Sequence, residues 1–289
     1  MKLKISHLTR YSYEREVSFS PHSIYLRPKE DGFLRLESYD CRTTPIGVGH
    51  WVRDYFDTPY LRNFFPEKNR ELRIEVSMTV GIMKRNPFDF LLDAHATNFP
   101  FDYTAEETAA LRSQLQPSGD HAAGLLQEWL DGVRPDSGTE TVAFVTELNQ
   151  SIWKNFEYGR RDQPGVQSPE ETLKTRSGSC RDFAWLLAEA CRSLGLAARF
   201  VSGYLYVPGG TESEGDTPES TMHAWSEIYL PGAGWKGFDP ANGVLCDEYY
   251  LPTATARTPE GGAPVQGTYF SDRPVTSAMH SELQMEVIG

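Results

Sequence analysis

Along the first 83 residues, apolar and polar side chains alternate in short runs. The runs are KLKIS, TRYSYE, SIYLRP, LRLESYD and LRIEVSMTV, with turn residues around 28–32. Alternation with a period of two, rich in threonine, tyrosine, valine and isoleucine, is typical of strands that are buried on one face. The pattern therefore predicts a β-rich N-terminal domain over residues 1–85, folded as an antiparallel β-sandwich.

Beyond residue 85 the period of the pattern changes. Residues 86–103 are rich in proline, aspartate and aromatic residues without a clear period, which is typical of a connector. Apolar residues three and four positions apart then indicate helices, with Thr104 and Thr139 as candidate N-caps. The predicted helices cover residues 105–115, 121–133, 141–156 and 180–194.

Three predicted strands follow the last of these helices. They cover residues 198–207, 223–230 and 234–239, and PGAG joins the last two as a hairpin. Helices followed by an antiparallel sheet indicate an α+β fold. We therefore expect a connector with helices over residues 86–139, a core over 140–252 and a C-terminal tail over 253–289, in which SELQMEVI is a candidate for one returning strand.

The chain is acidic: 28 lysine and arginine residues against 40 aspartate and glutamate residues give a net charge of −12 at pH 7. Nucleic acids and anionic membrane surfaces are bound by clustered basic residues, so this balance argues against both as partners. No window approaches the roughly 18 consecutive apolar residues of a membrane span, and the N-terminus lacks the apolar core of a signal peptide. We expect a cytoplasmic protein, and the sequence leaves its oligomeric state open.

The four cysteines, Cys41, Cys180, Cys191 and Cys246, are too scattered for a disulfide framework or a zinc site. No CxxC motif is present, so we expect neither a metal ion nor another cofactor. Cys191 shares a helix face with the apolar residues of the predicted helix at 180–194, which predicts a thiol packed in the core.

Cys180 stands at a different kind of position. The stretch RSGSCRDFAWLLAEACRSLG places it behind small polar residues at the start of an apolar helix. Ser177 or Ser179 can cap that helix, and Gly195 fits its C-terminal end. The unpaired N–H groups and the dipole of a helix N-terminus favour the thiolate, which is the nucleophilic form of cysteine. Cys180 is therefore a candidate nucleophile.

A cysteine nucleophile needs a base, and the base usually needs a third residue that fixes its tautomer. His223 opens one predicted strand and Asp239 ends the next. If Pro231–Ala233 forms a three-residue loop, Leu230 lies opposite Gly234, and His223 becomes the diagonal neighbour of Asp239 on one face. A four-residue loop would turn the aspartate to the other face. A triad of these residues thus predicts an odd-length loop or a bulge.

The motifs around these residues resemble the core of the transglutaminase-like superfamily, in a bacterial branch often described as cysteine proteases. The matching stretches are GSCRDFAWLLAEACRSLGLAARFVSGYLY and MHAWSEIYLPGAGWKGFDPANG, and TRYSYEREVSFSPHSIYLRP is similar to the β-rich region that precedes the core in this branch. The resemblance implies a papain-like core, in which a helical bundle with the catalytic cysteine at a helix N-terminus packs on an antiparallel sheet. It also implies that Cys180 is the nucleophile, His223 the base and Asp239 the residue that orients it.

Polar groups beside the cysteine have supporting roles in this hypothesis. Arg176 and Arg181 would lower the pKa of the thiol by favouring the thiolate, with ordinary surface charges as the alternative. Asp182 either stabilises the first helical turn or pairs with a nearby arginine. The backbone N–H of Cys180 is the candidate oxyanion donor because it lies at the helix start.

Three aromatic residues are candidates for substrate binding. The hydroxyl of Tyr158 is a candidate second hydrogen-bond donor to the oxyanion, with packing of the ring as the alternative. Tyr204 is a candidate pocket wall. Trp225 shares a strand face with His223, so it would shield the His–Asp pair or stack on a substrate.

Three functional hypotheses follow. An enzyme that forms a thioester at Cys180 and passes the acyl group to water would be a protease, peptidase or amidase acting on a peptide or protein. We favour this hypothesis because water needs no dedicated acceptor site. Transfer to an amine would make the protein a crosslinking transglutaminase. A peptide-binding module that keeps the fold without turnover belongs to a different class.

Overall fold

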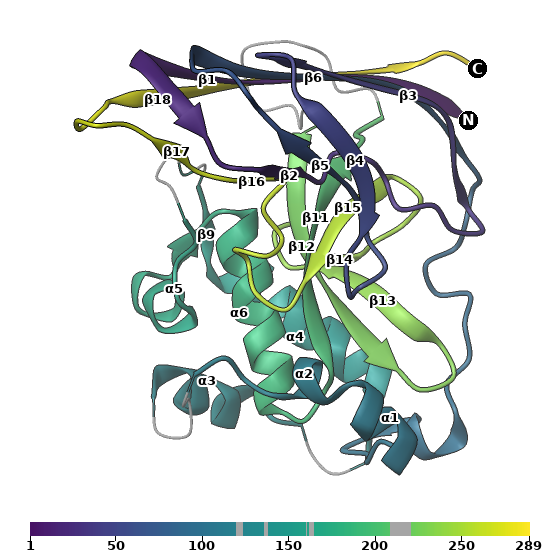
Figure 1. Ribbon diagram of the computed structural model, residues 1–289. Coiled ribbons are helices and arrows are strands. Elements are labelled where there is room, and N and C mark those ends of the chain that lie inside the picture. Colours follow the sequence, from purple (N-terminus) through teal and green to yellow (C-terminus); the bar gives the residue numbers. More distant parts are fainter. Residues whose placement is uncertain (120–123, 136–137, 160, 162–164, 209–220) are drawn as a thin grey trace.

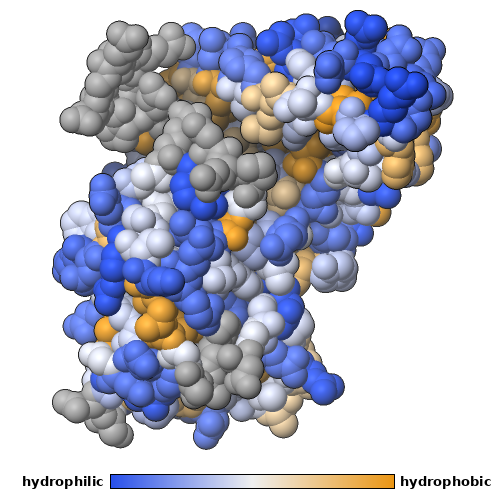
Figure 2. Space-filling view, turned by 90° about the vertical axis from the view of Figure 1, so that its left-hand side faces the viewer, coloured by the Kyte–Doolittle hydropathy of each residue, from blue (hydrophilic) through white to orange (hydrophobic). Residues whose placement is uncertain are grey.

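Two sheets form the upper part of the molecule in Figure 1, and a helical body built on a third sheet lies beneath them. The computed structural model describes residues 1–289 except 120–123, 136–137, 160, 162–164 and 209–220. In the perpendicular view of Figure 2, the upper part overhangs the narrower lower body, and hydrophilic residues cover much of the face.

The upper part is an antiparallel β-sandwich. One sheet has the order β17-β1-β6-β3, with β18 also paired to β1, and the other has the order β16-β2-β5-β4. Their bounds are β1 Lys2–Phe19, β2 His22–Ile24, β3 Leu34–Thr44, β4 Val48–Arg53, β5 Pro59–Phe64, β6 Asn69–Ile82, β16 Val265–Gln266, β17 Tyr269–Phe270 and β18 Ser277–Val287. Every pairing in these two sheets is antiparallel, which confirms the predicted architecture.

The apolar residues of the alternating runs form the inner face of this sandwich. Leu3 and Ile5 on β1 and Leu72 and Ile74 on β6 are fully buried, and they share one cluster with Ile24 of the opposite sheet. The runs KLKIS and TRYSYE form one continuous strand of 18 residues. Sequence analysis does not predict β4, because all six of its residues are exposed and no apolar side of the strand faces a core.

The C-terminal segment completes the N-terminal sheet. β18 pairs antiparallel with β1 from Leu3↔Val287 to Tyr13↔Ser277, so the candidate returning strand is present. Both ends of the described chain therefore contribute strands to this sheet, and the α+β body lies between these strands in sequence.

Helices lie within all four predicted ranges, the first of which holds two helices, whereas the helix Pro169–Thr175 is not predicted. Thr104 caps the first of them through a capping box with Glu107, as predicted. The prediction for Thr139 is wrong, because this residue lies in a short strand and Glu140 is the N-cap of α4.

No helix of the described residues is both long and apolar enough to cross a membrane. The bounds are η1 Ala94–Ala96, α1 Ala105–Ala110, α2 Arg112–Leu115, α3 Leu125–Val133, α4 Thr141–Asn155, α5 Pro169–Thr175 and α6 Cys180–Ser193, with the short strands β7 Asn98–Phe99, β8 Thr139–Glu140, β9 Glu157–Tyr158 and β10 Ser177–Gly178 between them.

The sheet of the lower body has the order β14-β13-β12-β11-β15. Its strands are β11 Ala198–Leu205, β12 Thr221–Leu230, β13 Gly234–Asp239, β14 Val244–Leu245 and β15 Tyr250–Ala256. Helix α6 packs on β12 and β11. Sequence analysis does not predict β15, and this strand crosses the boundary expected between residues 252 and 253, so the sheet of the core extends to Ala256.

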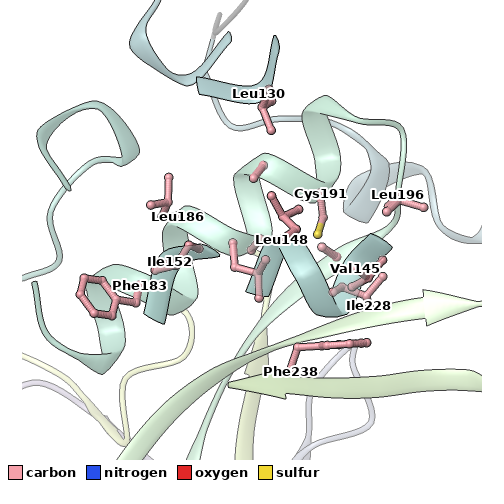
Figure 3. Close-up of a cluster of buried hydrophobic side chains, with 14 of the residues drawn as sticks. Leu130, Val145, Leu148, Ile152, Phe183, Leu186, Cys191, Leu196, Ile228 and Phe238 are labelled. Carbon is pink, nitrogen blue, oxygen red and sulfur yellow. The ribbon is translucent and has the colours of Figure 1, made fainter. Parts of the chain in front are cut away.

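Helix α6 is held in the middle of the main hydrophobic core. Figure 3 shows Phe183, Leu186 and Cys191 of this helix among side chains from α4 and the sheet. Cys191 is fully buried, which confirms its predicted place in the core. Burial of a Leu or Phe side chain contributes about 1.5–3 kcal/mol, so this packing holds the first turn of α6 against the sheet.

A glycine on β11 leaves room for the side chains around His223. Gly203 pairs with His223 on one side and with Pro252 on the other. A Cβ atom at this position would lie 2.1 Å from the carbonyl oxygen of Leu251 and 2.8 Å from the ring of Trp225. The backbone therefore approaches too closely for any side chain.

We expect the Gly203→Ala variant to unfold at a lower urea concentration than the wild type. Overpacking of this kind costs about 1–3 kcal/mol, because neighbouring strands must move apart. Gly32→Ala is the matched control, since a Cβ at Gly32 meets nothing within 4 Å. Equal unfolding midpoints for the two variants would show that β15 does not need this close approach.

Candidate active site

Cys180 is the first residue of α6, and the turn that carries it is fixed by hydrogen bonds. Ser179 is the N-cap. The buried carboxylate of Asp182 accepts from the N–H and the hydroxyl of Ser179, both at 2.8 Å through Oδ2, and from the N–H of Gln167 at 2.7 Å through Oδ1. Asp182 also pairs with Arg161 at 3.0 Å, so both of its predicted roles are present.

The two arginines expected beside the thiol have other partners. Arg181 donates to the carbonyl oxygen of Arg161 at 3.2 Å, and the guanidinium of Arg176 lies 5.0 Å from the ring centroid of Phe156. The groups that lower the pKa of Cys180 are instead His223 and the backbone N–H of Ala224. The prediction that arginines activate the thiol is therefore wrong.

The hairpin of β12 and β13 places His223 next to Asp239. Leu230 pairs with Gly234 across the three-residue turn at 231–233, so the loop has the odd length that the sequence predicts. His223 Nε2 lies 2.8 Å from Asp239 Oδ2, and both side chains are buried. Because Nε2 faces the aspartate, Nδ1 is the ring nitrogen left for Cys180, whose pKa His223 lowers through hydrogen bonding and charge.

Asp239 is fully buried and accepts hydrogen bonds at both oxygens. Oδ1 accepts from the N–H groups of Ala241 at 2.8 Å and Asn242 at 3.3 Å. Oδ2 accepts from the Asn242 side chain at 2.6 Å and from the Tyr250 hydroxyl at 2.8 Å, besides His223. Neither Asn242 nor Tyr250 is among the predicted site residues. The turn sequence DPAN is a signal that could have located Asn242, whereas Tyr250 carries no local signal.

The electrostatics of the site favour a thiolate next to an imidazolium. Burial alone would raise the pKa of Cys180, but the hydrogen bond and the charge of His223 outweigh it and bring the pKa below its ordinary value. Burial would lower the pKa of His223, but the charge and the hydrogen bond of Asp239 raise it to about 10. At neutral pH the histidine thus keeps its proton, and its positive charge shifts the equilibrium of Cys180 towards the thiolate.

The other cysteines have the opposite electrostatic environment. Burial raises the pKa of Cys41 to about 11 and that of Cys191 to about 12, and it raises the pKa of Cys246 well above its usual range. Cys180 and Cys41 are partly exposed, whereas Cys191 and Cys246 are buried, so among the partly exposed thiols Cys180 alone has a lowered pKa. A reagent that requires the thiolate should therefore distinguish Cys180 from the other three.

We expect iodoacetamide to label Cys180 alone at pH 6–7. A lowered pKa means that more thiolate is present at a given pH, so the labelling rate of Cys180 should already be high where the raised pKa values leave the other cysteines protonated. Peptide mapping by mass spectrometry measures this rate for each cysteine as a function of pH. Cys41→Ser is the control and should leave the labelling unchanged. A Cys180 that reacts only above pH 8 would contradict the expected ion pair.

Two of the three aromatic candidates do not face a substrate. Tyr204 is fully buried, with its hydroxyl 3.0 Å from His7 Nδ1 and 3.3 Å from the carbonyl oxygen of Leu26. It joins the sandwich to the core, so its assignment as a pocket wall is wrong. Trp225 is 1% exposed and lies against Tyr250 at 5.4 Å between ring centroids, which rules out substrate stacking and agrees with a shielding role.

Tyr158 lies beside the start of α6. It pairs with Gly178, two residues before Cys180, and its ring centroid is 6.2 Å from that of Phe183. Its side chain is 53% exposed. Substrate binding by Tyr158 stays a prediction.

Two family models match this chain. That of the transglutaminase-like superfamily matches residues 127–240, and that of the bacterial transglutaminase-like N-terminal region matches residues 3–81. An uncharacterized protein of Mycobacterium leprae (strain TN) is 38% identical over 273 residues, which cover 93% of this chain and 93% of that protein. The chain belongs to the transglutaminase-like superfamily.

Within the superfamily, a solved structure resembles the whole chain. A crystal structure described as that of a "putative cysteine protease" from Cytophaga hutchinsonii has a TM-score of 0.72 and 20% sequence identity, and the match covers 100% of this chain and 92% of that one. This likeness confirms the predicted fold, a β-rich N-terminal region followed by a papain-like, transglutaminase-like core.

A shorter match reaches an enzyme of known name. The peptide-N(4)-(N-acetyl-beta-glucosaminyl)asparagine amidase of Rattus norvegicus is 33% identical over 89 residues, or 30% of this chain and 11% of that protein. Together, the superfamily and the fold support an enzyme that uses cysteine-based catalysis.

In the part of the chain that the structure describes, no group of three or more His, Cys, Asp or Glu side chains is placed to hold a metal ion.

Proposed function

We propose that this protein hydrolyses amide bonds in a peptide or protein through a thioester at Cys180, with His223 as the acid and base and Asp239 as the residue that orients it. The observation that carries the proposal is the position of His223. Its ring is hydrogen-bonded to a buried carboxylate, and through its charge and hydrogen bonding it lowers the pKa of a thiol at a helix N-terminus. This arrangement supplies a nucleophile, a proton carrier and an orienting group in one site.

In the first half of the reaction, the Cys180 thiolate attacks the carbonyl carbon and a C–S bond forms. The negative charge moves to the carbonyl oxygen, where the N–H of Cys180, in the first turn of α6, would stabilise it. The C–N bond then breaks, and the imidazolium of His223 gives its proton to the leaving amine. The products of this half are a free amine and an acyl group bound as a thioester to Cys180.

In the second half, neutral His223 takes a proton from a water molecule as that water attacks the thioester. The C–S bond breaks, the carboxylic acid leaves, and the thiolate–imidazolium pair is restored. Asp239 keeps its negative charge throughout, because the hydrogen bonds donated to its buried oxygens stabilise the carboxylate. We favour water over an amine as the acceptor because water requires no dedicated binding site.

Product analysis separates hydrolysis from transfer and from binding without turnover. Wild type and Cys180→Ala would each be incubated with a peptide library and a labelled primary amine, and intact mass spectrometry would follow the protein and the peptides over time. Shorter peptides and an early acyl adduct on Cys180, both absent from the variant, are the expected result. Amine-tagged peptides would instead support a transglutaminase. A wild type that forms neither product nor adduct would favour the peptide-binding module.

A further inference from the structure

Tyr250 lies outside the proposed triad and reaches Asp239 from β15, a strand at one edge of the sheet. It begins β15, and in the strand order β11 and β12 lie between β15 and β13, the strand that ends with Asp239. Its hydroxyl nevertheless lies 2.8 Å from Asp239 Oδ2, the same oxygen that faces His223 Nε2.

The side chain crosses these strands over Gly203. Tyr250 pairs with Leu205, two positions from Gly203, and Gly203 pairs with His223, so all of these positions lie on one face of the sheet. Because Gly203 has no side chain, the ring of Trp225 occupies the space above it and packs on the ring of Tyr250. The ring of Tyr250 also lies 6.1 Å from the imidazole of His223.

We propose that Tyr250 is a positioning residue whose hydroxyl limits how strongly Asp239 holds the imidazolium of His223. This inference rests on the proposed function and deepens it. The residue that adjusts the proton transfer of His223 then lies on β15, a strand that supplies no member of the triad.

The physical argument is competition for one oxygen atom. A hydrogen bond donated to a carboxylate stabilises its negative charge and reduces its attraction for a second donor. With the Tyr250 hydroxyl in place, Oδ2 divides its charge between the tyrosine, Asn242 and His223. Without it, Asp239 would bind the imidazolium more tightly, so His223 would release its proton to the leaving amine less readily.

Tyr250→Phe tests the hydroxyl separately from the ring. The phenyl ring can keep its contacts with Trp225 and His223, while the hydrogen bond to Asp239 is lost. In protein with ¹⁵N-labelled histidine, the Nε2–H proton resonance of His223 is expected to move downfield at pH 7, because its bond to Asp239 becomes stronger. The value of kcat is expected to fall about tenfold, the effect of losing one hydrogen bond of this kind.

Tyr249→Phe is the matched control. This neighbouring tyrosine has its ring 5.8 Å from that of Tyr206, and its replacement should leave the resonance and kcat unchanged. A His223 resonance that stays in place or moves upfield in Tyr250→Phe would overturn the inference, since a purely structural tyrosine would change only the stability.

A second variant keeps the inference testable if Tyr250→Phe does not fold. Asn242 is exposed, and its side chain donates to the same Oδ2 atom, so Asn242→Ala should move the resonance in the same direction without disturbing the core. An unmoved resonance in this variant would also contradict the inference. The resonance is measured without substrate. Absence of turnover in the wild type would therefore refute the proposed function, whereas an unmoved resonance would refute the role of Tyr250.

Discussion

The Asp239→Asn variant is expected to lose about 10⁴-fold in kcat, the order of loss that follows when the orienting carboxylate of such a triad becomes an amide. Asparagine has one acceptor oxygen and one NH₂ group, whereas donors face both oxygens of Asp239. In the variant an NH₂ group would meet at least one of those donors. The imidazolium of His223 would also lose the negative charge that raises its pKa to about 10.

The sign of the effect on Cys180 follows from the same interactions. Without the charge of Asp239 the pKa of His223 falls, because burial lowers it, so a larger fraction of the rings is neutral at pH 7. The thiol then loses the positive charge that brings its pKa below the ordinary value, and the thiolate fraction at neutral pH decreases. The pH dependence of iodoacetamide labelling measures this directly, and the rate at pH 7 should fall in the variant.

Asp247→Asn is a suitable control for this experiment. Its carboxylate accepts from the N–H of Tyr249 at 2.9 Å, away from His223. The control should keep the labelling rate and kcat of the wild type. An Asp239→Asn protein that still labels rapidly at pH 7 would mean that Cys180 is activated without the help of His223.

The Glu189→Gln variant is expected to lose about 3–5 kcal/mol of unfolding free energy, because it leaves a buried arginine without its counter-charge. Glu189 and Arg192 are both fully buried in α6, with Oε1 and Nη1 2.6 Å apart. The carboxylate also accepts from the N–H of Ser118 at 2.7 Å. Arg192 donates to the carbonyl oxygens of Ala198, at 2.8 Å, and Arg257, at 2.7 Å.

Urea unfolding with two companion variants tests this expectation. Glu75→Gln removes an ion pair with Arg73 in which both side chains are more than 40% exposed, and such pairs contribute about 0–1 kcal/mol. The double variant Glu189→Gln/Arg192→Met should recover part of the loss, because it removes the uncompensated charge. Losses that simply add in the double variant would contradict an interaction between these two residues.

The central geometry of the site could be predicted because it depends on local sequence. Small residues before Cys180 indicate a helix start, and a hairpin register is determined by the length of its loop. A three-residue loop places His223 beside Asp239; the rules left the loop length open, and the triad that the family resemblance implies required an odd length. By contrast, Tyr250 reaches the site through strand pairing between β15 and β11, and no periodicity or turn signal reports which distant strands will be neighbours.

The misassigned residues show the same limit. Tyr204 lies in a motif close to the site in sequence, but its side chain contacts the sandwich, which is formed by residues far away in the chain. The strand β4 was missed because a strand with no buried face has no apolar alternation to detect. Local patterns thus predict elements and turns, while the direction of a side chain between two packed layers depends on tertiary contacts.

The pairing of β18 with β1 has a consequence for how the chain reaches its folded state. β1 precedes the α+β body in sequence, but β18, one of its neighbours in the sheet, follows that entire body. One edge of β1 therefore stays open to other extended segments until β18 arrives, and such open edges favour misassociation. Because contacts of large sequence separation slow folding, the sandwich should be the last part of the molecule to become complete. The lower body, whose sheet lies wholly between Ala198 and Ala256, can form its hydrogen bonds first.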